Sequence, residues 1–102
     1  MAELVYKGGA RADLAATFDY LAEHNLNSAQ RFIGAVQRRC DLLRQYPELG
    51  VARDDLGPGI RALPIWRRVV IAYCIEPNAI EIIGVFYGGQ DYQTILQDDP
   101  DR

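Results

Sequence analysis

The fold is decided by residues 69–87, whose sequence is VVIAYCIEPNAIEIIGVFY. Two runs rich in β-branched and aromatic residues, 69–75 and 80–87, flank the short segment 76–79, which contains a proline and an asparagine. β-Branched and aromatic residues favour the extended backbone of a strand, whereas proline and asparagine favour a tight turn. The stretch therefore predicts a β-hairpin.

Both faces of this hairpin are apolar. Successive side chains of a strand point to opposite faces. One face of the first strand carries Val69, Ile71, Tyr73 and Ile75, and in the second strand Ile80, Ile82 and Phe86 oppose Ile83 and Val85. The predicted second face consists of Val70, Ala72, Cys74, Ile83 and Val85. Either strong sheet curvature and the N-terminal strand hide this second face, or a partner protein covers it.

The N-terminal half predicts a strand and two helices. Residues 4–6 are a short apolar run ended by two glycines, which is typical of a strand. Residues 10–24 then carry apolar side chains at the helical spacing i, i+4, i+7. Asn27, with Gln30 three residues later, gives the capping signal of a second helix, which ends before Pro47. Two helices joined by so short a link form an αα-hairpin.

The remaining segments predict one more strand and an irregular tail. Residues 60–65 are extended, and because Pro64 cannot donate to a ladder, this strand lies at an edge or is bulged there. Gly88 and Gly89 end the sheet, and the acidic tail over residues 93–102 is expected to be partly disordered. The predicted order is β-α-α-β-β-β. It describes an α+β fold with an N-terminal strand, an αα-hairpin and a three-stranded antiparallel sheet.

Length and composition indicate one small domain. The chain has 102 residues and a net charge of −3 at pH 7, which argues against a surface devoted to nucleic acid. We therefore expect no sequence-specific DNA binding. No apolar run approaches the roughly 20 residues of a membrane span, and the N-terminus lacks the apolar region of a signal peptide. A cytoplasmic protein without membrane contact is expected.

No residue pattern predicts a cofactor or a metal site. The chain has no phosphate-binding loop, nucleophile elbow or zinc-protease motif. Cys40 and Cys74 lack the spacing of a metal or redox motif and are expected to be buried free thiols. Asp54, Asp55 and Asp91 could supply carboxylates, but nothing in the sequence fixes their spacing. We expect neither a cofactor nor a metal.

Ordered motifs along nearly the whole chain resemble a known toxin family. The C-terminal half contains GIRALP at 59–64, RVVIAY at 68–73 and IEIIGVFYGGQD at 80–91. The N-terminal half contains Ala10-x-x-Asp13-Leu14, Tyr20-Leu21, Ala29-x-x-Phe32 and YPELG at 46–50. This ordered set resembles the ParE/RelE superfamily of type II toxin–antitoxin systems, the plasmid-stabilisation type, and within it the ParE branch. Where that family has a histidine at the end of the last strand, this chain has Tyr87.

The resemblance implies a biological role. It implies a toxin that arrests growth and is neutralised, in a hetero-oligomeric complex, by a cognate antitoxin that is ParD-like or another small DNA-binding protein. ParE members are described as inhibitors of DNA gyrase, whereas RelE relatives cut mRNA on the ribosome. Two alternatives stay open beside the ParE role: a RelE-like, ribosome-dependent mRNA interferase, and a non-toxic family member that only binds the antitoxin.

The inventory of acids and bases favours a binder over a nuclease. Metal-independent RNA cleavage needs a base, an acid and cations around the reacting phosphate. Here the corresponding residues would be Arg61, Arg68 and Tyr87. Arginine stays protonated and therefore transfers protons poorly, and tyrosine, with an ordinary pKa of about 10, is a poor general base at neutral pH. The only histidine, His24, is expected at the solvated end of the first helix.

A binder is expected to use the end of the sheet around Tyr87. The expected contacts to the target or the antitoxin are Arg61, Trp66, Arg67, Arg68, Tyr87, Gln90 and Asp91. Tryptophan and arginine are enriched at binding hot spots. Other roles remain open: a solvated turn for Arg67 and Arg68, a lid on the core for Trp66, and hydrogen bonds that terminate the sheet for Tyr87, Gln90 and Asp91.

Overall fold

The computed structural model describes residues 2–66, 68–99 and 101–102. Its elements are β1 (Glu3–Tyr6), α1 (Gly8–Ala22), α2 (Leu26–Gln45), β2 (Val51–Ala52), β3 (Ile60–Trp66), β4 (Val69–Glu76), β5 (Ala79–Tyr87) and α3 (Tyr92–Asp98). The α+β class is confirmed, and so is the hairpin, because β4 and β5 pair antiparallel around residues 77–78. None of the helices in the described part of the chain has the length and apolar character needed to span a bilayer.

The sheet is mixed and has five strands, in the order β1-β5-β4-β3-β2. β1 lies parallel to β5, whereas the other neighbouring pairs are antiparallel. The prediction of a three-stranded antiparallel sheet is therefore incomplete. β2 has only two residues, too few to produce an alternating pattern. The chain crosses through α1 and α2 from β1 at one edge of the sheet to β2 at the other, and β1 pairs with β5, which is distant in sequence. The bulge expected at Pro64 is confirmed, because the pairing register shifts between Pro64 and Trp66.

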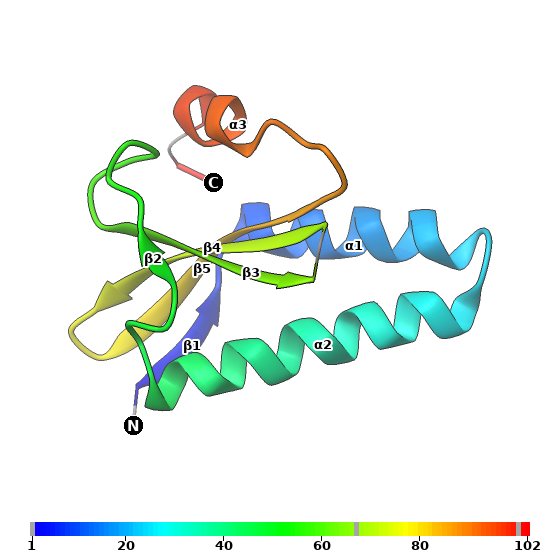
Figure 1. Ribbon diagram of the computed structural model, residues 1–102, viewed down its shortest axis with the longest axis horizontal. Coiled ribbons are helices and arrows are strands. Elements are labelled where there is room, and N and C mark those ends of the chain that lie inside the picture. The colour runs from blue at the N-terminus through cyan, green and yellow to red at the C-terminus, as the bar shows by residue number, and fades with distance from the viewer. Residues whose placement is uncertain (1, 67, 100) are drawn as a thin grey trace.

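The helical hairpin covers one face of the sheet (Figure 1). α1 and α2 lie side by side and are joined by a short turn at residues 23–25. The main core contains Phe32, Val36, Cys40, Leu43, Val69, Ile71, Tyr73, Ile80, Ile82 and Val85. Cys40 and Cys74 are free thiols, of which Cys40 is fully buried. Burial raises the pKa of the Cys40 thiol to about 11.

Both long helices begin earlier than the sequence predicts. α1 includes the two glycines expected to end the first strand, and the N–H of Gly9 donates to the carbonyl of Arg102 at 2.9 Å. α2 is capped by Asn25 rather than Asn27, because the Asn25 side chain accepts a hydrogen bond from the N–H of Ser28 at 3.2 Å. These acceptors satisfy donors that the first helical turn leaves unpaired.

A β-bulge in β5 exchanges the faces of two residues. The pairing register shifts between Ala72 and Tyr73, which leaves Ile83 of β5 without a partner in β4. One extra residue reverses the alternation of every side chain beyond it. Val85 therefore packs in the main core and Phe86 on the opposite face. The assignment of Val85 to the second face is wrong.

The chain itself covers the opposite face of the sheet. The cluster on this face, here called the α3 cluster, contains Leu56, Ile60, Ala72, Phe86 and Leu96, with Cys74, Ile83, Tyr92 and Ile95 packed against it. Val70 lies outside the α3 cluster and is half-buried. The segment expected to be a partly disordered tail forms α3, which the sequence pattern missed because only Leu96 of its seven residues is buried. The helical hairpin is therefore not the only cover of the sheet.

Replacing Leu96 with alanine should lower the free energy of unfolding by about 2–3 kcal/mol, since the α3 cluster loses its contact to the helix. The freed sheet face should also bind a hydrophobic dye. Urea unfolding and dye fluorescence measure the two effects. Gln97→Ala is the matched control, because Gln97 is exposed on the same helix. Equal stability of the two variants would show that α3 does not cover this face.

Candidate functional site

The guanidinium of Arg61 is bound to the loop between α2 and β2. Its Nη1 donates hydrogen bonds to the carbonyl oxygens of Gly50, at 2.6 Å, and Glu48, at 3.4 Å. Tyr73, opposite Arg61 on β4, donates its hydroxyl to the carbonyl of Pro47 at 2.6 Å and accepts from the N–H of Gly50 at 2.8 Å. We call Gly50, Arg61 and Tyr73 the loop brace. Arg61 therefore has a structural role in holding this loop.

Aromatic side chains gather where β5 ends. The ring of Tyr87 lies edge-on to the buried ring of Phe32, with 6.1 Å between the centroids, and 6.5 Å from the ring of Tyr20 on α1. Tyr20 also contacts His24, at 5.7 Å between ring centroids. Tyr20 is 56% exposed and His24 is exposed as well. We call Tyr20, His24 and Tyr87 the aromatic surface.

Arg68 lies beside the aromatic surface. It is exposed, and its carbonyl accepts a hydrogen bond at 2.8 Å from the N–H of Gly88, the residue after Tyr87. On the other side, Trp66 of β3 pairs with Val69 of β4. The Trp66 side chain and Arg67 lie outside the described residues, so their predicted contact roles stay predictions.

The structure separates the three residues of the nuclease alternative. Arg61 pairs with Tyr73 of β4, whereas Tyr87 pairs with Val69, four positions along the same strand. Four strand positions correspond to about 13 Å. Arg68 and Tyr87 thus share one end of the sheet, and the guanidinium of Arg61 is bound elsewhere, at the loop brace.

Gln90 and Asp91 organise the exit of the last strand. The side-chain carbonyl of Gln90 accepts a hydrogen bond from the N–H of Tyr87 at 2.8 Å. Asp91 caps α3, because its carboxylate accepts from the hydroxyl of Thr94 at 2.7 Å and from the N–H of Thr94 at 3.2 Å. The bond of Gln90 agrees with a role in terminating the sheet, whereas the bonds of Asp91 begin α3.

Acidification should loosen α3 through Asp91. The hydrogen bonds from Thr94 hold the pKa of the Asp91 carboxyl below its usual value. A carboxyl with a lowered folded pKa stabilises the fold above its unfolded pKa of about 3.9, and loses that contribution as pH falls through the folded pKa. The urea midpoint should therefore fall more between pH 5 and pH 3 in the unaltered chain than in Asp91→Asn, which can cap but does not titrate. Parallel pH profiles would contradict this.

The carboxylates considered for a metal each serve a local contact. Asp55 accepts two hydrogen bonds from the guanidinium of Arg53, at 2.9 and 2.8 Å, and this pairing holds the pKa of Asp55 below its usual value. Asp54 accepts from the N–H of Gly59 at 3.2 Å, and Asp91 caps α3. Within the described residues, no three His, Cys, Asp or Glu side chains gather as a metal site requires.

Sequence reasoning named Tyr87 and Arg68 as candidates but did not name two residues of the aromatic surface. Tyr20 and His24 lie one helical turn apart near the end of α1, far from Tyr87 in sequence. The available signal was their i, i+4 spacing, which places two side chains together on a helix. Only the packing of α1 against β5 brings them to Tyr87. Chemically, the aromatic surface and the neighbouring exposed Arg68 offer aromatic rings and a cation, which suits contact with another protein.

Comparisons with known proteins agree with this fold. Residues 4–92 match the family model described as the ParE toxin of the type II toxin-antitoxin system, parDE. The curated proteins give no match. A solved structure described as "Chromosomal ParDE TA system from P. aeruginosa" is similar in fold, with 23% identity, a TM-score of 0.72, and coverage of 86% of this chain and 97% of that chain. Since the family model spans most of the sequence, the chain belongs to the ParE toxin family of type II toxin–antitoxin systems.

Proposed function

We propose that this chain is a toxin that arrests growth by binding its target in the cytoplasm, and that a cognate ParD-like antitoxin neutralises it. Membership of the ParE family supports the toxin role and the antitoxin partner. The resemblance to ParE rather than RelE toxins supports DNA gyrase as the target.

The observation that carries binding over RNA cleavage is the position of Arg61. Its guanidinium is bound to the carbonyls of Gly50 and Glu48. Arg61 pairs with Tyr73, four strand positions from the residue that pairs with Tyr87, so Arg61 and Tyr87 are not gathered around one reacting phosphate as cleavage requires. Arg68 and Tyr87 remain at the sheet end as contact residues.

The aromatic surface has the properties of a protein-binding site. Tyr87 is half-buried and its ring is supported by Phe32, so binding immobilises little additional side-chain freedom. Tyr20 and Arg68 are exposed beside it. Tyrosine and arginine are prominent among residues that carry binding energy at interfaces.

Induction of the chain alone in bacterial cells tests the proposal. We expect growth arrest with signs of DNA damage, while transcripts stay intact. Rapid, ribosome-dependent loss of transcripts would favour the mRNA interferase instead. Unaffected growth, together with tight binding of the antitoxin, would identify a non-toxic family member.

Two variants at Tyr87 separate contact from chemistry. Tyr87→Phe keeps the ring and removes the hydroxyl, so a toxin that acts by packing should keep its growth arrest. Tyr87→Ala removes the ring and should weaken target binding about tenfold or more, the loss typical of a hot spot. If both variants lose toxicity, and the unaltered chain degrades transcripts while the variants do not, the hydroxyl takes part in RNA cleavage.

A further inference from the structure

Three arginines of α2, Arg31, Arg38 and Arg39, have few partners within the fold. All three are exposed. Arg31 donates a hydrogen bond to the hydroxyl of Ser28 at 3.4 Å, and no hydrogen bond or ion pair of the other two is found among the described residues. Five other arginines donate to a carbonyl or a carboxylate of the chain, namely Arg11, Arg44, Arg53, Arg61 and Arg102. The three arginines of α2 therefore keep most of their donors for an external partner.

Two of these arginines flank a hollow on the outer face of α2. Arg31 and Arg38 are seven positions apart, close to two helical turns, so their side chains share one side of the helix and lie about 10 Å apart along its axis. The hollow has a volume of about 580 Å³ and is lined by Asn25, Asn27, Gln30, Arg31, Gly34 and Arg38. We call it the α2 hollow. Apart from glycine, every lining side chain is an amide or a guanidinium, both of which donate hydrogen bonds.

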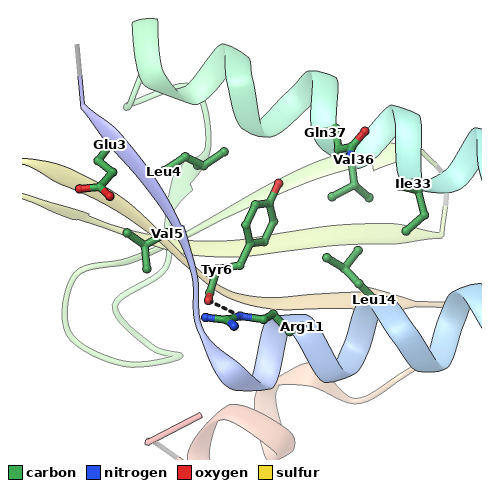
Figure 2. A pocket seen from close by; sticks show the side chains of 9 residues that line it. All are labelled: Glu3, Leu4, Val5, Tyr6, Arg11, Leu14, Ile33, Val36 and Gln37. Carbon is green, nitrogen blue, oxygen red and sulfur yellow. Dashed lines mark hydrogen bonds between the residues drawn. The ribbon is translucent and has the colours of Figure 1, made fainter.

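The α2 hollow lies on a different side of the helix from the groove between β1 and the two long helices. Figure 2 shows Ile33 and Val36 on the groove side, pointing from α2 toward Leu14 of α1. No residue lines both recesses. Substitutions in the α2 hollow therefore leave the lining of that groove unchanged.

Gly34 makes room for the α2 hollow. It lies inside the 20-residue helix and is half-buried, although glycine in a helix interior is less favourable than alanine. A Cβ at this position would lie 3.2 Å from Nη1 of Arg38. The guanidinium of Arg38 thus lies beside the space that a side chain at position 34 would occupy, at the edge of the hollow.

The charge and chemistry of the α2 hollow favour a polyanion. Residues 24–40 contain three arginines and no aspartate or glutamate, although the whole chain has a net charge of −3. Asp41 is the only acidic residue of α2. Protein–protein interfaces have an apolar centre, and no apolar side chain lines the hollow. Arginine, asparagine and glutamine are typical contacts to the phosphates of DNA. The hollow therefore fits a phosphate backbone better than a protein segment.

The α2 hollow adjoins the aromatic surface. His24 of the aromatic surface directly precedes Asn25 of the hollow, at the turn between α1 and α2 (Figure 1). A target bound at the aromatic surface would therefore extend beside the hollow. Two arginines on an acidic chain supply little affinity for free DNA, but a second contact made next to an existing one acts at a high effective concentration.

We propose that the α2 hollow binds the phosphate backbone of duplex DNA that the target enzyme holds, while the aromatic surface contacts the enzyme itself. Arg31 and Arg38 pair with phosphates, and the amides beside them donate to phosphate oxygens. Such contacts position a protein on DNA without reading base sequence, in keeping with the expected lack of sequence-specific DNA binding. The inference rests on the proposed gyrase target.

The test measures binding of the fluorescently labelled chain to purified DNA gyrase, with and without a bound linear DNA duplex. The unaltered chain should bind the gyrase–DNA complex at least tenfold more tightly than gyrase alone. Arg31→Gln/Arg38→Gln should lose most of this gain and keep its affinity for gyrase alone within twofold. Arg11→Gln/Arg39→Gln is the matched control, because it removes the same charge outside the hollow, and it should keep the gain within threefold.

Salt dependence and Gly34 give independent readouts. Each phosphate contact contributes about 0.9 to the slope of log affinity against log salt concentration, so Arg31→Gln/Arg38→Gln should flatten this slope for the gyrase–DNA complex by about two. Gly34→Ala should raise the melting temperature, because alanine favours a helix. It should nevertheless bind the gyrase–DNA complex at least threefold more weakly, because its Cβ crowds the Arg38 guanidinium.

Four results would overturn the inference. Equal affinity of the unaltered chain for gyrase with and without DNA would exclude the DNA contact and leave the gyrase target standing. A gain that Arg31→Gln/Arg38→Gln retains would place the DNA contact elsewhere. An equal loss in Arg11→Gln/Arg39→Gln would show a general effect of charge instead of a site. No binding to gyrase in either state would refute the proposed target and this contact with it.

Discussion

Gly50→Ala should lower the free energy of unfolding by about 3 kcal/mol, which combines overpacking of a rigid site with the loss of a buried hydrogen bond. A Cβ at Gly50 would lie 2.7 Å from Cε1 and 2.8 Å from the hydroxyl oxygen of Tyr73, and 3.0 Å from the carbonyl oxygen of Ala62. Tyr73 is fully buried and the carbonyl belongs to β3, so neither can move freely. For a domain of this size, the melting temperature should fall by roughly 12 °C or more.

Gly89→Ala is the matched control for the loop brace, because nothing lies within 4 Å of a Cβ at that position. It should leave the melting temperature within about 2 °C of the unaltered chain. Tyr73→Phe should show an intermediate loss of about 1–3 kcal/mol, since it leaves the carbonyl of Pro47 and the N–H of Gly50 without their partner. If Gly50→Ala and Gly89→Ala have the same melting temperature, the loop is not held by close packing on Tyr73.

Asp13→Ala should destabilise the fold by about 2–3 kcal/mol, toward the lower end of the loss expected when one partner of a buried ion pair is removed. The Asp13 carboxylate accepts a hydrogen bond from the N–H of Val85 at 3.0 Å and pairs with Arg102. The Asp13 side chain is 17% exposed and the Arg102 side chain 11%. Removing the carboxylate would therefore leave the Arg102 guanidinium as a largely buried charge without its partner. Arg102 also donates to the carbonyls of Gly9, at 3.0 Å, and Ile83, at 3.2 Å.

A double-mutant cycle isolates the pair. Arg102→Ala alone removes these contacts and the stacking of the guanidinium on Phe86, at 5.3 Å from the ring centroid. Because the two residues contact each other, the loss in Asp13→Ala/Arg102→Ala should be smaller than the sum of the single losses by about 1–2 kcal/mol. Urea unfolding measures all three variants, and strict additivity would refute the ion pair.

Long, periodic segments made most of the fold predictable from sequence. The hairpin of β4 and β5 follows from two β-rich runs around a Pro-Asn turn, and α2 follows from its apolar stripe. β2 and α3 were not predictable in the same way, because two residues and one buried leucine make no pattern. They are held by tertiary contacts, β2 through its pairing with β3 and α3 through the α3 cluster.

The bulge in β5 had a local signal that was too weak to fix its position. Gly84 lies inside an otherwise β-rich run, and an isolated glycine in a strand indicates a bulge or a close approach. In the structure the ring of Phe86 packs so closely over Gly84 that a Cβ there would lie 2.6 Å from Cε2. The alternation before the bulge was therefore predicted correctly, and the faces of Val85 and Phe86 were exchanged.

The site was predictable only in part, for a similar reason. Tyr87 and Arg68 end up together because they flank one end of the β4–β5 ladder, which the hairpin prediction already contains. The role of Arg61 depends on the loop of residues 47–50, whose carbonyls have no signature in sequence.

The most direct test of the central claim is a supercoiling assay in which purified DNA gyrase is titrated with this chain. A toxin that acts by binding gyrase should inhibit supercoiling at roughly stoichiometric amounts, and the antitoxin should restore it. Tyr87→Phe should inhibit like the unaltered chain. Full supercoiling at a large excess of the chain, together with cleavage of mRNA when the chain is added to translating ribosomes, would contradict the account.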